Sequence, residues 1–168
     1  GSGIMGCCTG NGARALYYIW EHMLHYNRGT LSINLLMNRA SKWADVNSHI
    51  PYTGQVDIHV KRACKQLRVR IPEWVTPRQV KCLVKGKKHR LTWDKRYALI
   101  GSVKTGENIN VNFPLAEQKI ETDIQSQHYH LITRGNEVVD IYPRGQFCPL
   151  YQRDYYRTDQ TRWKKTNR

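Results

Sequence analysis

The stretch QVDIHVKRACKQLRVRIP, residues 55–72, carries the pattern on which the fold depends. Apolar and polar residues alternate along both of its halves, and Pro72 ends the second run. The apolar positions are Val56, Ile58, Val60, Leu67, Val69 and Ile71. Alternation with a period of two places one face of a strand in a core and the other toward solvent. This stretch therefore predicts two strands, each buried on one face.

The same alternation recurs on both sides of this stretch. Short turns rich in glycine or asparagine separate the segments, as at Gly106 and at Gly135-Asn136. The further predicted strands cover residues 31–35, 80–84, 97–102, 108–113, 119–124, 129–133 and 137–142. Many short strands with half-apolar faces are typical of two antiparallel sheets packed face to face. We expect a mainly β protein, an antiparallel, jelly-roll-like β-sandwich with one shared core.

A different period precedes the strands, between residues 13 and 26. Apolar side chains recur there at helical spacing and form a stripe of Ala13, Leu16, Tyr17, Trp20, Met23 and Leu24. Thr9 or Asn11 is a candidate N-cap, and residues 27–29, Asn-Arg-Gly, resemble a helix stop. The sequence thus predicts one α-helix before the sandwich. We expect its stripe to pack on the sandwich, which offers the chain's main apolar surface.

The segment GCCTGNG, residues 6–12, places two adjacent cysteines in a predicted glycine-rich turn at the start of this helix. Unpaired amide N–H groups at a helix start favour a thiolate, which is the reactive and metal-binding form of cysteine. Cys7 and Cys8 could supply half of a tetrahedral zinc site. The remaining cysteines show no Cys-x-x-Cys spacing that would complete it. Residues alone leave a metal or catalytic role open against two inert thiols.

Composition narrows the class of protein. The chain has 168 residues, a length suited to one domain, and a net charge of +14 at pH 7. Such a charge attracts anionic partners, but no nucleic-acid-reading motif accompanies it, so nucleic acid is not the favoured partner. No apolar run approaches the roughly 20 residues of a membrane span, and no signal peptide is visible. The compartment stays open between cytoplasm and periplasm.

Other candidate residues have simpler interpretations. Five cysteines, an odd number, argue against a disulfide framework, and we interpret Cys64, Cys82 and Cys148 as buried free thiols. His22 and His25 could chelate a metal, but we favour solvent-facing side chains because no third ligand is near in sequence. His128 and His130 share one strand face and could belong to a site, but we interpret that face as the solvent-facing side of a half-buried sheet. The polar group of Asp45, Asp57 and His59 could also belong to a site, although a scaffold without a complete site is the simpler interpretation.

Four segments together resemble glycoside hydrolase family 127, the β-L-arabinofuranosidase group that was formerly a domain of unknown function. GCCTGNGARALYYIWEHML, residues 6–24, resembles the end of its catalytic barrel. TLSINLLMNRASKWADV, residues 30–46, resembles the first strands after the barrel, and LRVRIPEW, residues 67–74, resembles a family strand signature. Residues 106–114 resemble a glycine-led strand that ends before a proline. The resemblance runs over most of the chain.

The resemblance implies a fold, a reaction and a zinc cofactor for a longer parent protein. Family members carry an (α/α)6 barrel followed by β-sandwich domains, and they hydrolyse terminal arabinofuranosides with retention. By resemblance Cys7 is the nucleophile and a zinc ligand, and Cys8 is a second zinc ligand. The other ligands, the acid/base glutamate and the sugar-binding histidines lie upstream in the family. Its partners would be the catalytic barrel of the same polypeptide and an arabinose-containing glycan.

The resemblance also divides the chain. Residues 1–28 would be the tail of the barrel, residues 29–150 the sandwich and residues 151–168 a basic tail or linker. We expect the chain alone to be inactive and without zinc. A stand-alone basic sandwich that binds acidic glycan or nucleic acid is the alternative. In that case exposed aromatic rings would stack on the ligand, and the candidates are Trp43, Trp74, Trp93 and Trp163.

Overall fold

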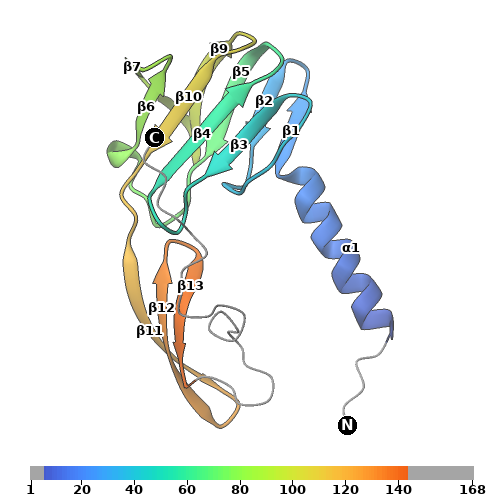
Figure 1. Cartoon of the computed structure of the whole chain (residues 1–168), viewed down its shortest axis with the longest axis vertical. Coiled ribbons are helices and arrows are strands. Elements are labelled where there is room, and N and C mark those ends of the chain that lie inside the picture. The colour runs from blue at the N-terminus through green and yellow to red at the C-terminus, as the bar shows by residue number, and fades with distance from the viewer. Residues whose placement is uncertain (1–5, 144–168) are drawn as a thin grey trace, which may run out of the picture. The chain divides into compact units, whose positions relative to one another are not determined.

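The computed structural model describes residues 6–143, which divide after Leu115 into two compact units. The first unit contains the helix α1 (Gly6–His22) and two five-stranded sheets. The second unit contains one three-stranded sheet. The protein is therefore mainly β, with one long helix at its start, as the sequence predicts (Figure 1).

One five-stranded sheet has the strand order β1-β2-β5-β9-β8. Its strands are β1 (Leu24–Asn27), β2 (Thr30–Ile33), β5 (Cys64–Arg70), β8 (Thr92–Asp94) and β9 (Tyr97–Val103). All neighbours pair antiparallel except β2 and β5, which are parallel. Between these two the chain crosses to the other sheet and back, the kind of long connection that parallel neighbours require.

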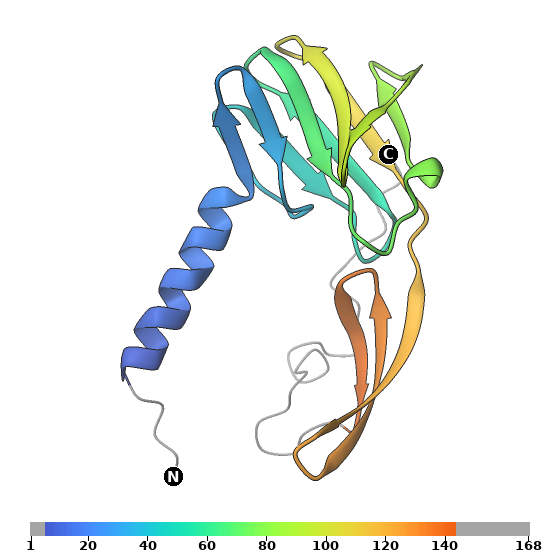
Figure 2. The ribbon, with the colours of Figure 1, turned by 180° about the vertical axis from the view of Figure 1, so that it is seen from behind.

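The second five-stranded sheet has the order β3-β4-β10-β6-β7 and is antiparallel throughout. Its strands are β3 (Ala44–Ser48), β4 (Gln55–Val60), β6 (Lys81–Val84), β7 (Lys87–His89) and β10 (Asn108–Asn112). A short 3-10 helix, η1 (Pro77–Gln79), precedes β6. Figure 2 shows this unit from behind, with the parallel pair β2 and β5 on the near side.

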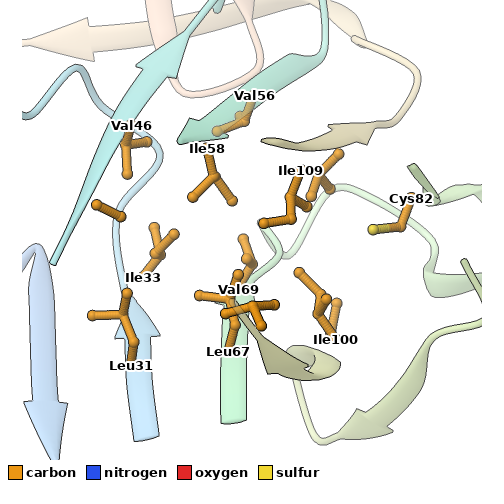
Figure 3. Packing of buried hydrophobic residues seen from close by; sticks show 14 of the residues in the cluster. Leu31, Ile33, Val46, Val56, Ile58, Leu67, Val69, Cys82, Ile100 and Ile109 are labelled. Carbon is orange, nitrogen blue, oxygen red and sulfur yellow. The ribbon is translucent and has the colours of Figure 1, made fainter. Parts of the chain in front are cut away.

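The core lies between the two sheets (Figure 3). Side chains of β2 and β5 point toward those of β3, β4 and β10, and most of them have no exposed surface. Its fully buried members include Leu31, Ile33, Val46, Val56, Ile58, Leu67, Val69 and Ile109. The alternating apolar positions of residues 55–72 all contribute to this core, which confirms the predicted sandwich.

The helix differs from its predicted bounds. It begins at Gly6 and ends at His22, so Asn11 lies inside it rather than at its N-cap. The next residues form β1, which pairs with β2 through a tight turn in which Arg28 (φ 47°) and Gly29 (φ 88°) both have positive φ. The predicted helix stop is thus a hairpin turn, favoured because its twist matches that of the strands.

We expected the helical stripe to pack on the sandwich, but within α1 it is exposed. Met23 and Leu24 are buried in the core, but they lie after the helix. Apolar residues within α1 are between 50% and 69% exposed: Leu16, Tyr17, Tyr18, Ile19 and Trp20. They surround the helix rather than forming a single stripe, because all five are consecutive in the sequence.

The second unit is a sheet of its own. Its strands β11 (Glu117–Ile124), β12 (Gln127–Arg134) and β13 (Glu137–Tyr142) pair antiparallel in sequence order. The sequence predicted these three strands, but the expectation that they share the sandwich core is wrong. Few of their side chains are buried, chiefly Thr133 and Ile141, because a single small sheet covers little apolar surface. The predicted tail at residues 151–168 lies outside the described residues.

Candidate functional site

Cys7 and Cys8 lie in the first turn of α1, not in a turn that precedes the helix. Both are exposed free cysteines, and their Sγ atoms are 3.9 Å apart. The first backbone N–H groups of a helix have no intrahelical partner, so these thiols stand where a negative charge is favoured. The structure thus places both thiols at the start of a helix and open to solvent.

The spacing of the two sulfur atoms suits a shared metal ion. Sulfur ligands about 2.3 Å from a tetrahedral zinc are roughly 3.8 Å from each other, close to the 3.9 Å found here. Two further ligands are needed for a closed site. Among residues 6–143 the one group of three or more metal-ligating side chains includes neither cysteine. The pair therefore fits half of a zinc site.

The glycines around the pair have open surroundings. Beyond the neighbouring residues and the backbone of α1 itself, a Cβ atom added at Gly6, Gly10 or Gly12 would meet no atom of the described residues within 4 Å, and none of the three has a positive φ. Each glycine costs a helix about 1 kcal/mol relative to alanine. Neither packing among the described residues nor backbone conformation explains these glycines.

Cys64 and Cys82 are buried free thiols, as predicted. Burial raises the pKa of Cys64, and it raises the pKa of Cys82 to about 11. A thiol in such surroundings is a weak nucleophile, because the thiolate is the reactive form. The structure therefore separates two inert cysteines from the two exposed ones at the start of α1. Cys148 lies outside the described residues.

The polar group around β4 is divided among three small networks. The carboxylate of Asp57 accepts hydrogen bonds from Gln55 and Asn110 and lies 2.8 Å from Nε2 of His49. Burial is the largest influence on the pKa of Asp57 and acts upward, but these hydrogen bonds together lower it. Asp45 instead pairs with Lys61, and His59 with Asn108. Their partners are structural, and they do not converge on one site.

The two histidine pairs differ. The rings of His22 and His25 stack with centroids 6.4 Å apart, and Nδ1 of His22 is hydrogen-bonded to the carbonyl of Tyr18. His128 and His130 lie beside Glu121 on the neighbouring strand. Sequence reasoning named these histidines but missed the carboxylate. The register of the β11–β12 hairpin was the signal that could have found it.

The tryptophans proposed as glycan platforms pack on the core. Trp43, Trp74 and Trp93 are partly buried against the core cluster. The ring of Trp43 stacks on Tyr26, and Trp74 meets Phe113 edge to face. Trp163 lies outside the described residues. Core packing therefore accounts for the three described rings.

No helix in the described part of the chain has the length and apolar character to span a membrane.

The chain is similar in structure to parts of larger hydrolases. Ara127N, a GH127 β-L-arabinofuranosidase from Geobacillus stearothermophilus T6, matches with a TM-score of 0.55 and 21% identity, over 80% of this chain and 24% of that one. A structure described as a glycoside hydrolase matches with a TM-score of 0.60 and 18% identity, over 80% of this chain and 25% of that one. Another GH127 β-arabinofuranosidase matches with a TM-score of 0.57 and 15% identity, over 80% of this chain and 26% of that one.

These similarities show that the chain has the fold of one part of each solved structure. The chain spans about a quarter of the length of each of these solved structures. Neither a protein-family model nor a curated protein sequence matches the chain.

Proposed function

We propose that the chain is the C-terminal part of a retaining glycoside hydrolase that acts on terminal arabinofuranosides. The observation that carries the proposal is an exposed apolar helix with a pair of cysteines in its first turn. The similarity to a quarter of larger hydrolase chains supports it. In this proposal α1 is the last helix of a catalytic barrel, and the sandwich is its structural support.

The surface of α1 supports the barrel assignment. Leu16, Tyr17, Tyr18 and Ile19 are each at least half exposed, and at about 100° per residue they lie on different sides of the helix. A helix that is apolar all round is normally buried among other helices. We propose that helices of the same polypeptide surround α1, as neighbours do in a helical barrel. The described residues do not provide this cover.

The cysteine pair supports the proposed chemistry. Cys7 and Cys8 would hold zinc together with ligands from the barrel, and their 3.9 Å sulfur separation suits that role. Zinc, when bound, keeps a coordinated thiol deprotonated at neutral pH. The open surroundings of Gly10 and Gly12 would let barrel residues and the sugar approach the helix start closely.

Cys7 would act as the nucleophile. Its thiolate forms a bond to the anomeric carbon while the bond from that carbon to the leaving-group oxygen breaks. A carboxylic acid of the barrel protonates the departing oxygen, and its carboxylate then takes a proton from the water that displaces the Cys7 sulfur. Two displacements at one carbon retain the configuration. The acid/base group and the other ligands would lie in the barrel, so we expect residues 1–168 alone to be inactive, with or without added zinc.

The test compares cysteine variants of the full-length parent. Hydrolysis of an aryl arabinofuranoside should fall below detection in Cys7→Ser, because a serine hydroxyl is not ionised at neutral pH. Cys8→Ser should lower both activity and the zinc content per chain. Cys82→Ala changes a buried thiol far from the proposed chemistry and serves as the control. Hydrolysis by Cys7→Ser at rates near those of the unmodified parent would overturn the nucleophile assignment.

A further inference from the structure

One face of the β11–β12 hairpin gathers two histidines and two carboxylates. Glu121 lies directly opposite His130 in the antiparallel register, and Asp123 lies opposite His128. Directly opposed residues in an antiparallel pair project to the same face, and so do residues two apart on one strand. All four side chains therefore stand on one face, and all are exposed.

The ligand atoms of three of these residues already lie close together. One donor atom from each of Glu121, His128 and His130 can be chosen so that all lie within 4.8 Å of one another. Nδ1 of His130 is 3.4 Å from Oε1 of Glu121, and Nε2 of His128 is 3.9 Å from Oε2. Nitrogen and oxygen ligands about 2.0–2.1 Å from a tetrahedral zinc are roughly 3.3–3.4 Å apart. Small side-chain rotations would thus bring the three atoms onto one ion.

Asp123 orients one of the two imidazoles. Its Oδ1 atom is 2.6 Å from Nδ1 of His128. A carboxylate in that place holds the proton on Nδ1, which leaves the lone pair of Nε2 free. Nε2 is the nitrogen that faces Glu121. A carboxylate that orients a metal-binding histidine from behind is a common outer partner in zinc sites and strengthens the ligand.

We propose that Glu121, His128 and His130 bind a divalent transition-metal ion, with zinc as the expected ion, and that Asp123 positions His128. Two imidazoles with one carboxylate select zinc, copper or nickel over calcium and magnesium, which prefer oxygen ligands alone. Three protein ligands leave at least one position for water or another ligand. The ion would connect β11 to β12 in a small sheet with few buried side chains.

This site is independent of the proposed hydrolase chemistry. It lies in the second unit, whereas Cys7 and Cys8 belong to the first. Ion pairing alone is a weak reason for the cluster, because exposed pairs contribute little to stability. A metal ion gives all three donors a common partner.

The test is a calorimetric titration of the chain with zinc chloride in a Cys7→Ser/Cys8→Ser background, which removes competing exposed thiolates. One zinc should bind per chain. The ring nitrogen resonances of His128 and His130 should shift in step with binding, whereas those of His59 stay in place. His128→Asn and His130→Asn should each weaken binding by more than Asp123→Ala, for which about 10–100-fold is expected.

His25→Asn is the matched control, because His22 and His25 form a stacked pair that belongs to no group of three ligands among residues 6–143. It should leave the affinity unchanged. Zinc should also raise the midpoint of thermal unfolding in the Cys7→Ser/Cys8→Ser chain, and His130→Asn should remove that rise. Binding that stays unchanged in both His128→Asn and His130→Asn would overturn the proposal. So would a dissociation constant above about 1 mM in the unsubstituted cluster.

Discussion

The indole ring of Trp43 stacks on the phenol ring of Tyr26, with centroids 3.8 Å apart and planes inclined by only 13°. Tyr26 belongs to β1, at the edge of one sheet, and Trp43 directly precedes β3, at the edge of the other. The contact therefore joins the two sheets along one side of the sandwich. The cationic side chains of Lys42 and Arg62 lie within 5.3 Å of the Trp43 ring centroid.

Trp43→Ala should destabilise the sandwich by about 2–4 kcal/mol, because it removes a large partly buried ring and its stacking contact. The midpoint of urea unfolding, followed by circular dichroism, checks this. Tyr17→Ala removes a ring of α1 that is 55% exposed and should change the free energy of unfolding by less than about 0.5 kcal/mol. Equal losses in both variants would mean that the stacked pair does not join the sheets in solution.

Leu31→Ala should cost about 2–5 kcal/mol of unfolding free energy, because Leu31 is fully buried between the sheets. Leu35 lies two alternations further along but follows the end of β2 and is 36% exposed. Leu35→Ala should therefore cost less than about 1 kcal/mol. The two substitutions remove the same atoms, so urea denaturation of both variants compares burial alone. A larger loss for Leu35→Ala would contradict the end of β2 at Ile33.

The same two leucines show what the sequence could predict about the fold. Alternation identified Leu31, Val56 and Leu67 as core residues because one face of each strand is buried. It could not show where β2 ends, since Leu35 continues the period. The prediction of where the helix ends was wrong for a similar reason. Met23 and Leu24 fit the helical spacing, but their burial comes from the sandwich, through pairing with Ile33 and its neighbours.

Long-range pairing also limited prediction of the candidate sites. The alternation in β11–β13 indicates strands, yet it does not say which sheet they join. Glu121 meets His130 only because the two-residue turn after Ile124, with Gln125 at φ 57°, sets the register. By contrast, Cys7 and Cys8 are neighbours in the chain, so their proximity needed no tertiary information.

Asp57→Asn should make the free energy of unfolding less dependent on pH in the acidic range. Hydrogen bonds from Asn110 and Gln55 and the nearby His49 lower the pKa of Asp57, although burial opposes them. The folded protein thus binds this proton less tightly than the unfolded chain does. The ionised carboxylate stabilises the fold above its ordinary pKa of 3.8, and that contribution is lost as pH falls through the lowered value.

Urea unfolding between about pH 6 and pH 2 measures this effect. The Asp57→Asn variant should be less stable near neutral pH and lose less stability on acidification than the unsubstituted chain. Asp94→Asn is the control, because its carboxylate is 57% exposed and its ion-pair contact to Arg68 is 3.8 Å long. That variant should follow the unsubstituted curve. A steeper acid loss in Asp57→Asn would contradict the sign of the lowered pKa.

Alkylation of the native chain with iodoacetamide at about pH 8 should separate the described cysteines into two classes. With its pKa raised to about 11, Cys82 is about 0.1% thiolate at that pH, and burial also blocks the reagent. Cys64 is protected in the same way, whereas Cys7 and Cys8 are open to solvent. Peptide mapping by mass spectrometry should find label on Cys7 and Cys8 first, and on all four in denaturant. Label on Cys82 at the rate of Cys8 would mean that strand β6 separates readily from its sheet, because the buried Cys82 thiol cannot otherwise meet the reagent.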